Sequence, residues 1–142
     1  MTSSSKPEKS DQPILWLTSV GLRPTRQRRD LARLILKGGE RHLTAEALFA
    51  EAQAAKVDVS LATIYNALRQ FTEAGLLREI PIDAARSYYD TRLNDHPHFF
   101  WEETGEIEDA PPDSVLIARL PEPPQGAKLA RVDVILRLRR EG

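Results

Sequence analysis

The sequence has no cysteine among its 142 residues. This excludes disulfides, thiolate zinc sites, iron–sulfur clusters and a cysteine nucleophile, so any metal must be held by His, Asp and Glu. Long apolar runs are missing too. None approaches the roughly 18 to 20 residues that cross a bilayer, and the polar start lacks the apolar stretch of a secretory signal. We therefore expect a cytoplasmic protein with no membrane partner.

An excess of one charge is also absent, with 20 basic and 21 acidic residues, and 41% of the residues are hydrophobic. This composition allows a packed core. The charge is nevertheless divided, because residues 14–80 carry ten Lys and Arg against seven Asp and Glu, whereas residues 81–142 carry eight against twelve. Four arginines cluster in the first half: Arg23, Arg26, Arg28 and Arg29. On charge alone, such a cluster is more often a solvated helix face than a polyanion site.

Helix signals dominate residues 14–75, after a polar leader (residues 1–13) that we predict to be disordered. The run ILWLTSVGL predicts a short helix, and three more helices are expected to begin near Thr25, Thr44 and Ser60, the last ending at Gly75. The runs LLREIPI and RSYYDT, on either side of an Asp-Ala-Ala turn, predict a β-hairpin. These elements predict a winged helix-turn-helix domain over residues 14–90.

Residues 91–142 differ in sequence pattern from the first half: they contain short β-forming runs and prolines at 111, 112, 121, 123 and 124. Four runs are candidate strands: HFFWEE, the region of Ile107, VLIARL and VDVILRLRR. About 50 residues bury too little apolar surface to be stable alone, so we expect a second copy to complete this domain, through the alternating VDVILRLRR run. The predicted class is α+β: a winged helix-turn-helix domain followed by a small β-rich α/β dimerisation domain.

The fourth predicted helix has the features of a DNA-recognition helix. Its apolar residues recur at spacings of three and four, and its polar arc carries Thr63, Tyr65, Asn66 and Arg69, which suit base edges and thymine methyls. An amphipathic helix whose outer face meets only water fits the helix equally well. The hairpin and the arginine cluster in the same half favour DNA.

The three histidines are candidate metal ligands. His96 and His98 are two residues apart at the start of a predicted strand, a spacing that directs both imidazoles to one face. Two solvent-exposed histidines beside a proline are the alternative. His42, at the entrance of the third helix, would by itself be read as a surface loop residue.

Several motifs together resemble the ferric uptake regulator family of metal-responsive repressors. GLRPTRQR, RHLTAEALF, VSLATIYNALRQFTEAGLL and DHPHF occur in the family's order, between about Gly21 and Asp109. The Tyr-Asn pair, the LPEPP insertion, the VDVILRLRR ending and the absence of cysteine pairs are similar to its haem-linked iron response regulator branch. The resemblance implies an iron-responsive regulator that binds AT-rich operator DNA as a homodimer. It implies that Tyr65 reads bases and that Arg23 enters the minor groove.

The same resemblance implies one interdomain metal site, with ligands His42, Asp90, His96, His98 and Asp109. Three imidazoles and two carboxylates suit iron(II), manganese(II) or zinc(II) without choosing among them. Glu108 competes with Asp109, because a one-residue shift in a strand turns the side chain to the other face. The branch also implies haem, with His96 and His98 as axial ligands, and a haem-delivering protein as partner. However, the histidines are separated by Pro97, and no cysteine-proline haem motif is present.

Two other classes compete with this interpretation, besides a peroxide-sensing metal-dependent repressor within the family. An enzyme is disfavoured, because neither a nucleophile motif nor a Gly-rich phosphate loop accompanies the histidines. A metal-storage protein that does not bind DNA would explain the histidines. It would leave Tyr65, Arg23 and the arginine cluster without a role.

Overall fold

The computed structural model describes residues 11–142, which divide into two compact units with a boundary between Leu93 and Asn94. The predicted domain boundary after Asp90 lies three residues earlier. The reason for the difference is Thr91, whose N–H donates to the Arg41 carbonyl at 3.2 Å and whose hydroxyl accepts from the Arg41 N–H at 3.0 Å. These bonds keep the residues after Asp90 in the first unit.

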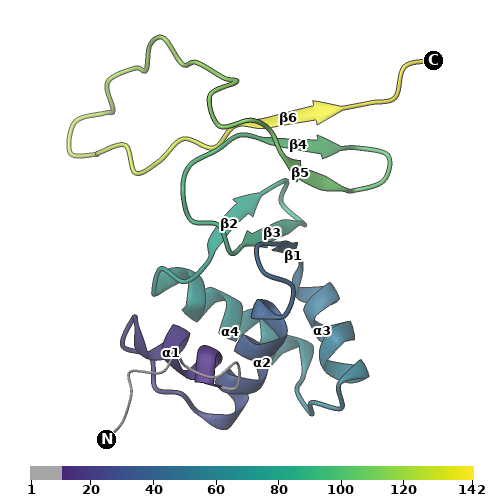
Figure 1. Cartoon of the computed structure of the whole chain (residues 1–142). Coiled ribbons are helices and arrows are strands. Elements are labelled where there is room, and N and C mark those ends of the chain that lie inside the picture. Colours follow the sequence, from purple (N-terminus) through teal and green to yellow (C-terminus); the bar gives the residue numbers. More distant parts are fainter. Residues whose placement is uncertain (1–10) are drawn as a thin grey trace, which may run out of the picture. The chain divides into compact units, whose positions relative to one another are not determined.

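The first unit contains four helices and a three-stranded sheet (Figure 1). The helices are α1 (Gln12–Thr18), α2 (Arg26–Leu36), α3 (Ala45–Ala54) and α4 (Leu61–Glu73), and the strands are β1 (His42–Leu43), β2 (Arg78–Pro81) and β3 (Ser87–Asp90). All pairings in the sheet are antiparallel, in the order β1-β3-β2. The unit is the winged helix-turn-helix fold, with β2 and β3 as the predicted hairpin.

The ends of the helices follow local chemistry that the sequence shows. The side chains of Thr25, Thr44 and Ser60 each accept a hydrogen bond from the N–H three residues later, at 3.0 to 3.3 Å, and cap α2, α3 and α4. Helix α4 ends before Gly75, whose φ of +90° is accessible to glycine without strain. Helix α1 begins earlier than predicted, because Gln12 and Pro13, assigned to the leader, form its first turn. Proline suits that position because its φ is already helical.

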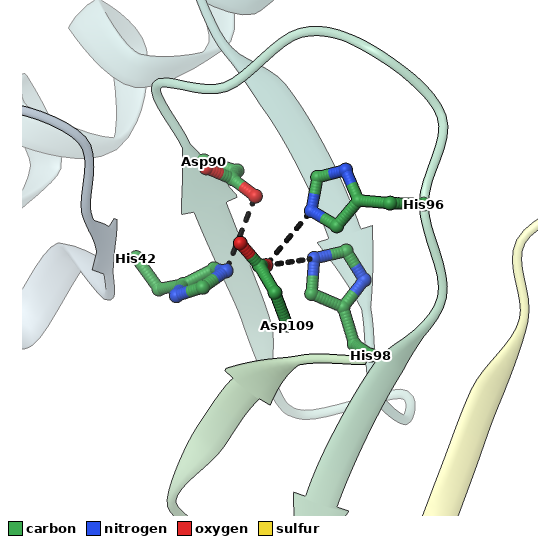
Figure 2. A group of neighbouring side chains, drawn as sticks. All are labelled: His42, Asp90, His96, His98 and Asp109. Atoms are coloured by element: carbon green, nitrogen blue, oxygen red, sulfur yellow. Dashed lines mark hydrogen bonds and ion pairs between the residues drawn. The ribbon is translucent and has the colours of Figure 1, made fainter. Parts of the chain in front are cut away.

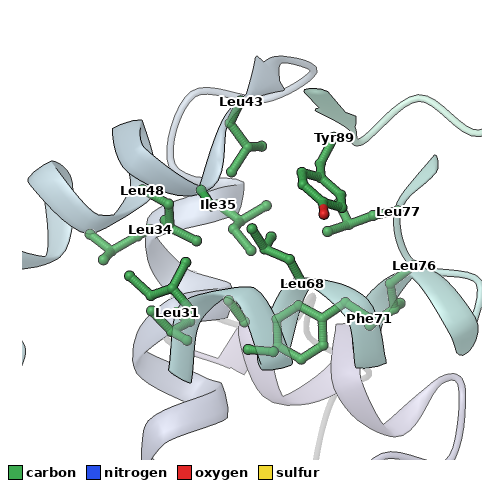
Figure 3. Packing of buried hydrophobic residues seen from close by; sticks show 14 of the residues in the cluster. Leu31, Leu34, Ile35, Leu43, Leu48, Leu68, Phe71, Leu76, Leu77 and Tyr89 are labelled. Atoms are coloured by element: carbon green, nitrogen blue, oxygen red, sulfur yellow. The ribbon is translucent and has the colours of Figure 1, made fainter. Parts of the chain in front are cut away.

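An apolar cluster of buried side chains holds the helices of the first unit together (Figure 3). Helix α4 contributes the fully buried Ile64, Leu68 and Phe71, and α2 contributes Leu31 and Ile35. The ring of Trp16 on α1 meets Phe71 edge-on, at 5.6 Å between centroids. This cluster seats α4 by its apolar stripe, so the opposite face of the helix is turned outward.

The second unit contains three strands, β4 (His98–Trp101), β5 (Ile107–Asp109) and β6 (Ile135–Leu138), in the order β5-β4-β6. The first two confirm predicted strands. The expectation of a strand at 115–120 is wrong, and β6 is shorter than the predicted run 132–139, because residues 110–134 form no strand. Prolines on both sides of 115–120 remove donors that a ladder would need.

No helix within residues 11–142 combines the length and the apolar character required to cross a membrane.

The packing of α4 predicts the effect of a truncation in the core. Leu68→Ala should lower the free energy of unfolding by about 2–5 kcal/mol, because a fully buried side chain leaves a cavity. Urea unfolding followed by helical circular dichroism measures this. Leu15→Ala on α1, where the side chain is 48% exposed, should change the free energy by no more than about 0.5 kcal/mol. Equal effects of the two substitutions would contradict the assigned core.

Candidate functional site

Strand register in the first unit brings His42 and Asp90 together. The pairing of β1 with β3 places the two residues directly opposite each other, and His42 Nε2 lies 3.1 Å from Asp90 Oδ2 (Figure 2). Asp90 is 1% exposed, and its Oδ1 accepts from the N–H of Arg92 at 2.8 Å. His42 is therefore not the surface loop residue that it would be taken for by itself: it opens a strand, and its side chain is only 17% exposed.

An ion pair anchors the strand that carries His42. The Arg41 guanidinium donates to the Glu51 carboxylate on α3, with Nη1 3.2 Å from Oε1, and also to the Leu34 carbonyl at 3.4 Å. The backbone of Arg41 bonds to Thr91, next to Asp90. The His42–Asp90 pair thus lies next to two fixed contacts, the Arg41–Glu51 ion pair and the bonds between Arg41 and Thr91. Sequence reasoning missed them, because β1 has two residues and shows no periodicity.

The second unit gathers a separate group: His96, His98 and Asp109. Asp109 Oδ1 lies 2.8 Å from His96 Nε2 and 3.3 Å from His98 Nε2, and the two ring centroids are 4.3 Å apart (Figure 2). Both imidazoles are buried. They are therefore not the solvent-exposed pair of the alternative interpretation. The β4–β5 register pairs His98 with Asp109 and Phe99 with Glu108, so Glu108 faces away from the imidazoles.

The hydrogen bonds of His96 define its donor pattern. Its Nδ1 lies 2.7 Å from the Asn94 carbonyl, and a carbonyl only accepts, so Nδ1 carries the hydrogen. In the neutral ring, Nε2 then carries no hydrogen, and its lone pair is directed at the Asp109 carboxylate. Two acceptors at this distance require a proton or a cation between them. A backbone carbonyl on the far ring nitrogen is also the usual outer partner of a metal-binding histidine, so the donor set fits a divalent ion.

The predicted DNA-reading residues lie on two segments of the first unit. Tyr65, Asn66 and Arg69 share the exposed face of α4, where Arg69 Nη2 donates to Asn66 Oδ1 at 3.2 Å. Thr63 is only partly exposed, and its N–H and Oγ1 both bond to the capping Ser60. Arg23 is exposed, in the loop before α2.

A contact missed in the sequence joins these two segments. Arg28 donates from Nη1 to the Arg23 carbonyl at 3.0 Å and from Nη2 to Gln70 Oε1 on α4 at 3.1 Å. This arginine of the basic cluster therefore fixes the loop of Arg23 to α4. Charge clustering alone does not distinguish such a structural role from a contact to phosphate.

The hydroxyl of Tyr65 has a partner on another helix. It donates to Glu46 Oε1, in the first turn of α3. This bond, together with desolvation and the negative charge of Glu46, raises the pKa of Tyr65 above its usual value of 10.

Comparison with known proteins gives one family. The model of the ferric uptake regulator family matches residues 19–136. The peroxide-responsive repressor PerR of Staphylococcus aureus is 30% identical over 99 residues, which make up 70% of this chain. They make up 66% of the repressor, so the match spans just under two thirds of that relative.

Solved structures share the fold. The ferric uptake regulator from Pseudomonas aeruginosa with manganese is 24% identical, with a TM-score of 0.67, and the alignment covers 92% of this chain and 99% of that chain. A zinc-bound manganese uptake regulator is 22% identical, with a TM-score of 0.62, and the alignment covers 94% of this chain and 100% of that chain.

Proposed function

The chain belongs to the ferric uptake regulator family, and from this premise we propose that it is an iron-responsive transcriptional regulator. It binds AT-rich operator DNA as a homodimer in the cytoplasm, under the control of a divalent ion. The observation that carries the proposal is the pairing of histidine with aspartate in each unit, His42 with Asp90 and His98 with Asp109. Both pairs follow from strand register, so the ligands are preorganised.

The proposed metal site combines the two groups: His42, Asp90, His96, His98 and Asp109. Imidazole and carboxylate ligands suit iron(II), manganese(II) or zinc(II), and the ion would act as a Lewis acid that holds five side chains at once. Ligands from both units would make the ion a link that restricts their relative motion. The resulting change in the spacing of two recognition helices in a dimer is the proposed route from metal to DNA affinity.

The metal prediction compares neighbouring acids. We expect one divalent ion per subunit, lost in His96→Ala and His98→Ala and weakened about tenfold or more in Asp109→Asn. Glu108→Gln is the matched control and should bind as the wild type does, because Glu108 lies opposite Phe99 rather than His98. Titration with manganese(II) followed by calorimetry measures the affinities. If the double variant His96→Ala/His98→Ala binds as much metal as the wild type, the site is refuted.

The proposed DNA surface comprises the exposed face of α4 and the Arg23 loop. Tyr65 and Asn66 offer groups suited to base edges, and Arg69 and Arg23 supply positive charge. Thr63 belongs to the proposed surface through the N-terminal turn of α4. The contacts of Arg28 support a joint action of the loop and the helix, because they hold both segments to one scaffold.

The DNA prediction separates base reading from charge. Tyr65→Ala should cost about 1–3 kcal/mol at a selected operator and little on random DNA, whereas Arg23→Ala should reduce the salt dependence of binding to AT-rich DNA by about one counterion. Fluorescence anisotropy at several salt concentrations measures both. Wild-type affinity of both variants would remove these residues from the interface. If the wild type itself prefers no sequence, the alternative of a metal-storage protein is favoured.

The second unit supports the proposed homodimer. Strand β6 lies at the edge of its sheet, and the segment 115–120 exposes Leu116 by 91% and Ile117 by 44%. A sheet edge and exposed apolar side chains are each a liability that a second copy would remove. We propose that the partner subunit covers both.

Light scattering tests the dimer. The wild type should have twice the 16.0 kDa mass of one chain at micromolar concentration. Leu116→Asp should shift the equilibrium toward the monomer while the unit stays folded, because this side chain has almost no contacts within its own chain. Leu15→Asp on α1 is the matched control and should remain dimeric. A monomeric wild type would overturn the assignment.

Peroxide sensing is the second candidate, and it is favoured by the identity of 30% with PerR. The two proposed aspartate ligands, Asp90 and Asp109, agree with the same function. With iron(II) and hydrogen peroxide, a sensor of this kind should gain one oxygen atom on a ligand histidine, visible by mass spectrometry. An iron regulator should keep its mass.

Haem control has less support than control by an ion. His96 and His98 are buried and direct Nε2 at the same carboxylate oxygen, so neither Nε2 is open to a bulky planar ligand. Haem at these two residues, and the haem-delivering partner that it implies, stay predictions. Binding of haemin that is lost in His98→Ala would support them.

A further inference from the structure

The bond between Tyr65 and Glu46 joins the two helices of the helix-turn-helix at its outer surface. Tyr65 is 43% exposed and Glu46 is also exposed, so the contact adds little to the core. Both side chains line an open cavity of about 460 Å³, together with Thr44, Glu79, Arg86 and Ser87. The other acid of the cavity, Glu79, accepts from the Ser87 hydroxyl at 2.7 Å. Glu46 is the acid that accepts a hydrogen bond from the hydroxyl of Tyr65 on α4.

The phenol of Tyr65 has one hydrogen to donate, and the bond to Glu46 uses it. The phenolic oxygen can then only accept further hydrogen bonds. In the major groove, adenine N6 and cytosine N4 carry amino donors, whereas thymine O4 and guanine O6 are acceptors. An acceptor-only Tyr65 oxygen matches the amino groups and opposes the carbonyl oxygens.

We propose that Glu46 is a specificity-determining residue that acts through Tyr65: by holding the phenolic hydrogen, it makes Tyr65 select bases with an amino group at the position that Tyr65 contacts. This inference rests on the proposed role of Tyr65 in reading DNA. Glu46 also brings a carboxylate close to that surface, which disfavours loosely bound DNA and so contributes to specificity by repulsion.

A structural role alone predicts something different. An acid in the first turn of a helix stabilises the positive end of the helix dipole, so Glu46 would support α3 wherever its carboxylate pointed. Its loss would then lower stability slightly and leave the base preference unchanged. Base preference is therefore the readout that separates the two roles.

The first measurement needs no DNA. Tyrosine labelled with carbon-13 at Cζ reports each phenol by nuclear magnetic resonance, and Tyr65→Phe assigns the signal. The pKa of Tyr65 should lie above 10 in the wild type and fall in Glu46→Ala, because both the hydrogen bond and the charge are lost. Glu40→Ala removes an exposed acid outside the cavity that Glu46 and Tyr65 line, and it should leave the titration unchanged. An unchanged titration in Glu46→Ala would overturn the inference.

The second measurement selects duplexes from a random library with the wild type, Glu46→Ala, Glu46→Gln and Glu40→Ala. At the position where Tyr65→Phe alters the preference, the wild type should favour amino-bearing bases by roughly two- to tenfold, the range of one hydrogen bond. Glu46→Ala should lose this preference, because the freed hydroxyl can also donate. Glu46→Gln should weaken it, and Glu40→Ala should keep it.

The two measurements distinguish the possible failures. If the wild type selects a sequence through Tyr65 and Glu46→Ala keeps the same preference, Glu46 is not a specificity determinant and the proposed function stands. If the wild type selects no sequence, the proposed function fails and this inference fails with it, whatever the titration shows. Unfolding curves of Glu46→Gln and Glu46→Ala exclude loss of fold as the cause.

Discussion

Antiparallel strand register is the constraint on which the proposed metal chemistry depends. In each unit it sets a histidine directly opposite an aspartate, His42 opposite Asp90 and His98 opposite Asp109. Side chains in such positions are close enough to share a ligand, and a slip by one residue would turn one of them to the other face. The main chain therefore selects the carboxylates. Glu108, one residue from Asp109, is excluded by register alone.

Arginine has structural as well as surface roles in the first unit. Arg28 bonds the Arg23 loop to α4 through Gln70, and Arg41 bonds β1 to α3 through Glu51. The Arg28–Gln70 bond connects segments distant in sequence that the proposed function uses together, whereas the Arg41–Glu51 bond holds β1 to the helix that follows it. The basic excess of the first half is thus partly internal, and fewer charges are available for phosphates than the sequence count indicates.

Much of the fold was predictable because its signals are local. The caps at Thr25, Thr44 and Ser60 and the glycine after α4 act within one helical turn. The hairpin follows from two β-forming runs around a short turn. Local signals do not predict a strand whose pairing depends on residues distant in the sequence. Strand β1 is too short for any period, and the apolar run at 115–120 forms no strand within the described residues 11–142.

The sequence by itself determined the family, the four helices and the hairpin of the first unit, and the residue types that could hold a metal, because each of these depends on identity and spacing along the chain. Only the tertiary structure decided the contacts of individual side chains. It placed Asp109 rather than Glu108 beside the histidines. It also directed the Arg28 side chain to the Arg23 carbonyl and the Tyr65 hydroxyl to Glu46. The physical reason is that a hydrogen bond depends on the position and direction of two atoms, and residues as far apart as Glu46 and Tyr65 acquire both only when their helices pack.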